Sequence, residues 1–192
     1  MKPSSIITTI LLSSISAVPA LADEYWDIRG TTSSARPDLA GTVLVDQVRR
    51  FQGFDSTGAT FKGTFQDRVV RRSVSGTLDF YYKITLDSAS TASISRVVRS
   101  GFDEVPMGSH DVAWRVDGLG TVGPSMAHRA AQCCIETIFG AAGGLNPGKE
   151  SRFVFIGTGA TQYDAKGVIN IFPIAPAGDR SVFVMTGFAP AT

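Results

Sequence analysis

The chain has 192 residues, with 18 basic and 17 acidic side chains and a formal net charge of +1. It therefore lacks the basic surplus with which proteins bind nucleic acids or anionic membranes. Its 20 glycines and only two cysteines indicate a fold with many turns that depends on a hydrophobic core rather than on a disulfide framework.

The N-terminal segment, residues 1–22, has the three parts of a secretory signal peptide. Lys2 supplies a positive start, residues 6–18 are uncharged and rich in Ile, Leu, Ser and Thr, and Ala-Leu-Ala at 20–22 is a small-x-small cleavage site. The apolar stretch is too short to span a bilayer comfortably. We expect a secreted or periplasmic protein that begins at Asp23 and has no membrane span. Without Lys2, 18 − 1 = 17 basic residues balance 17 acidic ones.

The sequence pattern of the remaining chain predicts a series of β-strands in one domain. We expect an extended N-terminal lead-in at 23–41, a single sandwich domain at 42–188 and a frayed tail at 189–192. The clearest strand is GTLDFYYKITL at 76–86, whose even positions are apolar or aromatic and whose odd positions are mostly polar, which predicts a half-buried strand. Further strands are predicted at 42–51, 59–66 with a continuation through 67–74, 94–99, 111–117, 152–158, 168–172 and 181–188.

Residues 125–140, SMAHRAAQCCIETIFG, fit two structures equally well. A helix would begin at Ser125 and end at Gly140, whereas a strand would alternate its side chains between two faces from Cys133 to Phe139. Short strands between turns rich in Gly, Pro, Ser and Asp, with at most one short helix near 126–139, predict an all-β fold. We expect an antiparallel β-sandwich that is jelly-roll-like.

The two cysteines, Cys133 and Cys134, are neighbours and are the candidate redox residues. Neighbouring Cα atoms lie about 3.8 Å apart, which is less than the usual separation across a disulfide. We therefore expect two thiols, at least one of them buried. A strained vicinal bridge and an intermolecular bridge are the alternatives.

Catalytic chemistry has few candidates in this sequence. His110 and Asp111 lie together at the start of a predicted strand, and Ser125 could complete a hydrolytic triad. However, GPSMA at 123–127 departs from the nucleophile elbow G-x-S-x-G in its last position. A histidine on the surface beside a loop is the simpler interpretation, and a secreted hydrolase that uses these loop residues is an alternative.

The spacing of the histidine and cysteine residues does not indicate a metal site. His128 and the two cysteines lack the intervals that let several ligands reach one zinc ion. Calcium would need several loop oxygens, but an aspartate in a turn can instead cap its own backbone. We therefore expect no cofactor, with a structural calcium ion as the alternative. The acidic residues in predicted turns are Asp55, Asp87, Asp103, Glu104 and Asp117.

Aromatic side chains could bind a sugar, because they combine an apolar body with a polar tip. Tyr81 lies on the polar face of its strand, so we expect it to be exposed, and Trp26 could cover one end of the sandwich. These two are the predicted ligand-binding residues, whereas Trp114 is expected in the core. The arginine pairs at 49–50 and 71–72 are typical of strands whose charges prevent edge-to-edge aggregation, with a site for acidic polysaccharide as the alternative.

Three stretches resemble one family of exported bacterial proteins: GTLDFYYKIT at 76–85, WRVDGLGTVGP at 114–124 and LNPGKESRFVFIGTGATQYD at 145–164. They are similar to the strand GTLDFYW-x-[VI]-T, the Trp-Arg-x-Asp-Gly-x-Gly loop and the L-x-PG-x-x-S-x-x-F-x-[FI]-x-T-x-A-x-x-[YF] segment of PEP-CTERM, or exosortase-sorted, proteins. The resemblance implies a secreted β-sandwich of a Gram-negative bacterium, associated with the cell surface or an extracellular polymer, and it implies no catalytic residues. The family's Pro-Glu-Pro sorting tail is replaced here by GFAPAT, so we expect a protein free in the periplasm or released.

Together these patterns predict a non-catalytic structural or binding protein of the cell envelope or extracellular matrix. A carbohydrate-binding module and a secreted hydrolase are the alternatives. The expected partners are an extracellular polysaccharide or another envelope protein, and not nucleic acid.

Overall fold

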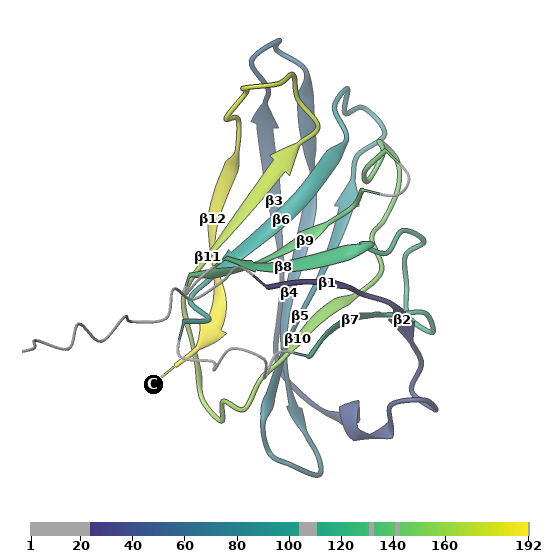
Figure 1. Cartoon of the computed structure of the whole chain (residues 1–192), viewed down its shortest axis with the longest axis vertical. Coiled ribbons are helices and arrows are strands. Elements are labelled where there is room, and N and C mark those ends of the chain that lie inside the picture. The colour runs from purple at the N-terminus through teal and green to yellow at the C-terminus, as the bar shows by residue number, and fades with distance from the viewer. Residues whose placement is uncertain (1–23, 104–110, 131–132, 141–142, 192) are drawn as a thin grey trace, which may run out of the picture.

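The structure is a computed structural model that describes residues 24–103, 111–130, 133–140 and 143–191. Two six-stranded sheets pack face to face, with sheet A in front in Figure 1. The predicted all-β sandwich is therefore confirmed. In spatial order, sheet A contains β1 (Glu24–Asp27), β8 (Met126–Ala130), β9 (Cys134–Ile138), β6 (Ile94–Ser100), β11 (Tyr163–Pro173) and β12 (Phe183–Pro190). Sheet B contains β2 (Gly30–Thr31), β7 (Asp111–Arg115), β10 (Val154–Gly157), β5 (Leu78–Leu86), β4 (Thr60–Arg72) and β3 (Gly41–Phe54).

The chain passes from one sheet to the other after β1, β5, β6, β7, β9 and β10. Strands β3 to β5 form an antiparallel meander, and β8–β9 and β11–β12 form antiparallel pairs. Only the pairing of β2 with β7 is parallel among the described strands. The repeated crossing gives the sandwich its jelly-roll-like winding.

The ambiguous segment 125–140 forms strands β8 and β9, so the possible helix near 126–139 is wrong. The two strands pair from Met126 opposite Ile138 to Ala130 opposite Cys134. Buried side chains alternate with less buried ones along β9, where Ile135 and Thr137 are buried and the residues beside them are less so. This period of two decides for a strand, because a helix would bury every third or fourth residue.

Strand β5 is buried on both faces, which corrects the prediction of a half-buried strand. Its even positions lie in the main core between the sheets, where Tyr82 stacks on Phe65 with ring centroids 5.3 Å apart. Its odd positions Asp79, Tyr81 and Lys83 are also buried. Residues 32–40, between β2 and β3, cover part of this outer face beside Asp79 and Tyr81, and we call them the strap. Lys83 instead lies near Phe153 and pairs with Glu150.

The strap packs through one apolar side chain. It contains the short 3-10 helix η1 (Pro37–Leu39). The helix begins with a proline, a residue that is favoured at the first helical position. Leu39 is buried in a second apolar cluster on the outer face of sheet B. Burial of a leucine contributes about 1.5–3 kcal/mol, which adds to the hydrogen bonds and ion pairs that hold the strap. The other members of this cluster are Val70, Tyr81, Phe153 and Phe155.

Both ends of the described chain belong to the sheets. In the expected lead-in, β1 pairs with β8 at one edge of sheet A, and β2 pairs with β7 at one edge of sheet B. In the tail that was expected to fray, Ala189 and Pro190 pair with Asp164 and Tyr163 of β11. Backbone pairing therefore extends beyond the apolar runs from which the strands were predicted.

A charged network crosses the core. Asp67 of β4 and Arg99 of β6 are 0% and 1% exposed, and their Oδ1 and Nη2 atoms lie 2.9 Å apart. Asp67 also accepts a hydrogen bond from the backbone N–H of Phe188 in β12, at 2.9 Å, and pairs with Arg49 of β3 at 3.2 Å. The network thus joins both strands at one side of sheet B to sheet A.

Replacing Asp67 should destabilise the sandwich strongly. Asp67→Ala leaves the guanidinium of Arg99 buried without its counter-charge, which should lower the free energy of unfolding by about 3–5 kcal/mol in urea titrations. Asp46→Ala is the matched control, because it breaks a more exposed pair with Arg68 and should cost at most about 1 kcal/mol. Similar small losses in both variants would contradict the role given to the buried pair.

Candidate functional site

A groove lies on the outer face of sheet B beside the strap. Its volume is about 440 Å³, which lies within the range of small-molecule sites. Buried apolar side chains form its floor, and the exposed side chains of Val43 and Leu119 stand at its mouth. The apolar lining consists of Leu39, Val43, Val70, Leu119 and Phe153, and the polar lining of Ser33, Arg68, Tyr81, Arg115 and Asp117.

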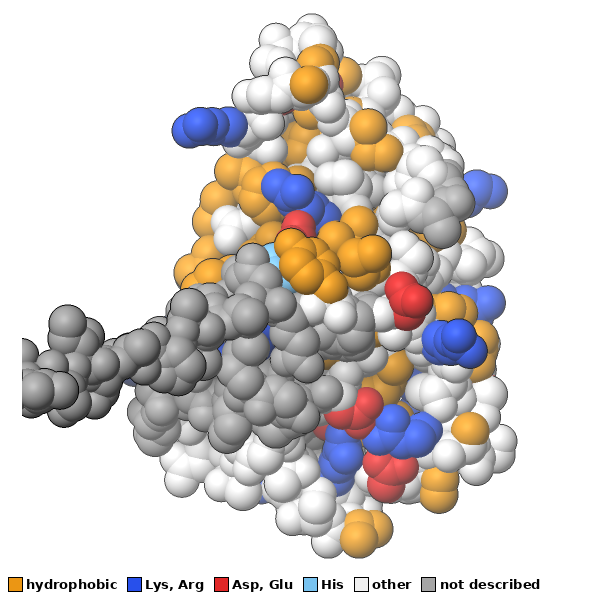
Figure 2. Space-filling view, viewed as in Figure 1, with side chains coloured by type: hydrophobic (Ala, Val, Ile, Leu, Met, Phe, Trp, Pro, Cys, Tyr) orange, Lys and Arg blue, Asp and Glu red, His pale blue; other side chains and the backbone are white. Residues whose placement is uncertain are grey.

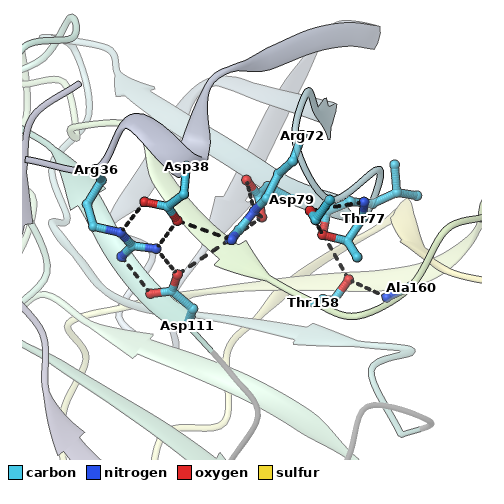
Figure 3. A network of polar contacts seen from close by, with 10 residues as sticks. Arg36, Asp38, Arg72, Thr77, Asp79, Asp111, Thr158 and Ala160 are labelled. Atoms are coloured by element: carbon cyan, nitrogen blue, oxygen red, sulfur yellow. Dashed lines mark hydrogen bonds and ion pairs between the residues drawn. The ribbon is translucent and has the colours of Figure 1, made fainter. Parts of the chain in front are cut away.

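A cluster of ion pairs fixes the strap above the sheet, next to the groove (Figure 3). Arg36 donates to Asp38 at 2.7 Å and to Asp111 at 2.5 Å. Arg72 donates through Nε to both oxygens of the buried Asp79 at 2.8 and 3.0 Å, and also lies within 3.3–3.4 Å of Asp38 and Asp111. The cluster therefore joins the strap to β4, β5 and β7.

The pKa values in this cluster move in directions that geometry explains. Hydrogen bonds to Asp38 and Asp111 raise the pKa of Arg36, and the hydrogen bond from Arg36 lowers the pKa of Asp38. Burial is the largest influence on Asp79 and raises its pKa, although Arg72 opposes the shift. The arginines thus stay charged. Of the three carboxylates in the cluster only that of Asp79 is fully buried, and Arg72 supplies its counter-charge.

One end of the groove is fixed by Asp117, which follows β7. Asp117 accepts hydrogen bonds from the backbone N–H of Ser33 at 2.6 Å, from its hydroxyl, and from Nε and Nη2 of Arg115 at 3.0 Å each. These bonds, above all that from Arg115, lower the pKa of Asp117. Arg115 also bonds to the hydroxyl of Tyr81, whose pKa burial raises to about 12. At neutral pH the groove therefore holds a fixed carboxylate and a neutral phenol.

The groove also holds a cation above an aromatic ring. The guanidinium of Arg68 lies 4.7 Å from the ring centroid of Phe153, and the ammonium of Lys83 lies 5.8 Å from it. Arg68 pairs with Asp46 at 2.6 Å, and Lys83 with Glu150 at 3.1 Å. Packing and pairing thus restrain both cations, which reduces the entropy lost when a ligand binds.

The structure places the two predicted ligand-binding residues on different sheets. Tyr81 lines the groove, but it is only 6% exposed, so the prediction that it is exposed is wrong. The period of its strand showed which face it occupies, but not that the strap covers this face. Trp26 lies in β1 of sheet A, opposite Ala127. Trp114 packs against the main core, as predicted.

The weak catalytic candidates are not brought together by the described residues. His110 lies outside them. Asp111 begins β7 in sheet B and is held by Arg36 and Arg72. Ser125 precedes β8 in sheet A, and its hydroxyl donates to the carbonyl of Ile138 at 3.4 Å. Their partners give both residues structural roles.

Cys133 and Cys134 form a disulfide, so the prediction of two thiols is wrong. Their Cα atoms lie 3.7 Å apart, as neighbours must, and the bridge closes a small ring instead of linking distant segments. The pair lies at the start of β9, on sheet A. A redox role for these residues stays a prediction.

Among the turn aspartates, Asp55 serves its own loop, whereas Asp117 bonds to Ser33 of the strap. Asp55 accepts hydrogen bonds from the backbone N–H groups of Thr57 and Ala59 at 2.9 Å each, which is the capping role expected for such a residue. Within residues 24–103, 111–130, 133–140 and 143–191, no group of three or more His, Cys, Asp or Glu residues could hold a metal ion together. Glu104 lies outside these ranges.

The arginine pairs have separate partners. Arg49 donates to the carbonyl of Thr186 in β12 as well as to Asp67, and Arg71 donates to the carbonyls of Gly76 and Thr161 at 3.0 and 3.1 Å. Neighbours on a strand face opposite sides, so neither pair makes a single basic patch. Their main effect is to join strands and turns.

No protein-family model, curated protein or solved structure matches this chain. Among the described residues, no helix has both the length and the apolar character needed to cross a membrane. The site must therefore be interpreted from its own chemistry. Sequence reasoning missed Ser33, Leu39, Arg115 and Phe153, because only the folded strap brings them together.

Asp117 should contribute stability in a pH-dependent way. Its pKa in the folded state is lowered below the value of about 3.9 in an unfolded chain, so its contribution is present above that pH and is lost as the pH falls. Asp117→Asn should lower the urea midpoint at pH 7, and its difference from the unmodified protein should shrink below about pH 4. Phe54→Ala, an exposed change at the end of β3 far from the strap, gives the baseline at each pH. A difference that stays constant down to pH 3 would contradict this role.

Proposed function

We propose that this protein is a secreted, non-catalytic binding protein of the cell envelope or extracellular matrix, and that the groove on sheet B holds its ligand. The groove itself is the observation that carries the proposal. It combines an apolar floor with polar groups that are already fixed by hydrogen bonds. A site prepared in this way binds with little loss of conformational entropy.

The ionisation states of the groove support binding rather than catalysis. A general acid or base works best when its pKa lies near the working pH. Asp117 has a lowered pKa and Tyr81 a raised one, so neither exchanges a proton readily at neutral pH. Arg68 and Arg115 stay protonated under all physiological conditions. The titratable side chains that line the groove thus orient a ligand without transforming it.

The lining favours a ligand with an apolar body and one acidic group. Two guanidinium groups, those of Arg68 and Arg115, line the groove, where Asp117 pairs with Arg115 and Asp46 pairs with Arg68 from outside the lining. A guanidinium binds a carboxylate through parallel N–H donors, and a charge-assisted hydrogen bond is stronger than a neutral one. The apolar body would lie against Leu39, Val70 and Phe153.

Binding in the groove can be tested with small aliphatic and aromatic monocarboxylates, followed by NMR spectra of the ¹⁵N-labelled protein. We expect shifts at the groove residues. Val43→Glu places a negative charge at the mouth of the groove and should weaken binding about tenfold. Val43→Gln, which adds a side chain of the same shape without the charge, should weaken binding less. Phe54→Glu, an exposed change at the opposite end of β3 from Val43, should bind as the unmodified protein does. Shifts elsewhere, or equal binding by Val43→Glu, would contradict the site.

Export and association with the envelope are proposed from the signal-peptide pattern at 1–22 and from the resemblance to PEP-CTERM proteins. Fractionation of the producing cells should recover a chain that begins at Asp23 from the periplasm, the cell surface or the extracellular polymer. N-terminal sequencing and polysaccharide analysis of each fraction would check this. A chain that keeps residues 1–22 and stays in the cytoplasm would contradict the proposed location.

A further inference from the structure

The outer face of sheet A differs from that of sheet B, because no segment among the described residues covers it as the strap covers sheet B. A row of side chains runs straight across this face, one from each strand, as the register shows. At the spacing of neighbouring strands, the row is about 24 Å long. From β1 to β12 its members are Tyr25, His128, Glu136, Val98, Asn170 and Val184.

The row begins with an aromatic ring that lies flat on the sheet. Tyr25 stacks on the imidazole of His128 with centroids 3.9 Å apart and an angle of 7° between the planes. His128 is 7% exposed and Tyr25 is 61% exposed. One face of the tyrosine ring therefore rests on the histidine, and the opposite face is open to solvent.

Polar groups follow directly beside this ring. His128 Nδ1 lies 3.0 Å from Glu136 Oε2, and Glu136 Oε1 lies 3.0 Å from Nε of Arg96. The guanidinium of Arg96 lies 4.3 Å from the ring centroid of Phe172, so it too is held flat against the sheet. In Figure 2, which views this face, acidic and basic side chains gather beside the histidine and the neighbouring hydrophobic side chains.

We propose that this face binds a neutral polysaccharide, with Tyr25 as its stacking platform. A pyranose ring has an apolar C–H face, which packs on a flat aromatic ring, and hydroxyl groups at its rim. Carboxylates accept hydrogen bonds from hydroxyl groups, and guanidinium groups donate to them. Tyr25, Glu136 and Arg96 present these three kinds of contact from β1, β9 and β6 of one sheet, with His128 of β8 between Tyr25 and Glu136.

Charge and shape decide the class of ligand. Glu136 of the row and Arg96 beside it neutralise each other, so this pair offers an acidic polymer no net attraction. The row crosses the full width of a six-stranded sheet, which suits a stretch of polymer more than a single sugar. This inference rests on the proposed function, because it names the polymer that an envelope or matrix protein would bind. The proposed site lies on sheet A, whereas the groove lies on sheet B.

Affinity electrophoresis of the full chain in gels that contain a soluble β-glucan, mannan or galactan would test this proposal, with alginate as the acidic comparison. At least one neutral polymer should retard the protein. Tyr25→Ala should lower the affinity about tenfold, the upper range for loss of an aromatic contact. Tyr25→Phe and Tyr25→Trp should keep the retardation, because stacking requires the ring and not the hydroxyl group.

Phe54→Ala is the matched control, because Phe54 is an exposed aromatic residue, 56% accessible, on sheet B. It should be retarded like the unmodified protein, and so should the groove variant Val43→Glu. Circular dichroism and thermal unfolding would confirm that each variant is folded. Retardation by alginate alone, the absence of retardation by all three neutral polymers, or equal retardation of Tyr25→Ala would overturn the inference. If a neutral polymer retards the protein but no monocarboxylate binds in the groove, only the proposed groove ligand is contradicted.

Discussion

The burial of β5 on both faces is the constraint on which the site depends. Every residue of this strand except Thr85 is buried, including the charged residues Asp79 and Lys83. A buried carboxylate needs a charged partner, and Arg72 supplies it within the strap cluster. The strap can thus cover polar residues of the sheet without leaving Asp79 unpaired. The same cover makes Tyr81 part of a groove floor instead of a surface residue.

The two sheets therefore have different outer faces. On sheet B the strap adds a partial third layer, and a concave site forms where this layer ends beside Val43 and Leu119. On sheet A, Tyr25 of β1 stacks on His128 and Arg96 of β6 lies over the ring of Phe172, so both are held at the surface of the sheet. Concave sites suit small ligands, and flat sites suit extended ones. One sandwich can thus present both kinds of binding surface, separated by the core.

The sequence predicted the strands well, because a period of two survives wherever one face is buried. It predicted the exposure of Tyr81 wrongly, because periodicity shows which side chains share a face but not what covers that face. Leu39, the residue that causes the burial, lies far away in the chain in a segment that lacked any periodic pattern. Tyr25 was overlooked for the same reason, since its role depends on the pairing of β1 with β8.

The charges explain why aromatic faces are the better candidates for recognition in this protein. Many charged side chains have partners within the fold: Asp67 with Arg99, Asp79 with Arg72, and Glu136 with Arg96. Such pairs fix strands and orient hydrogen-bonding groups, but they produce little field at a distance. A ligand must then be recognised at contact distance, through ring faces and fixed donors and acceptors. Neutral, polyhydroxylated molecules are recognised in this way, and the row beside Tyr25 has the groups that they require.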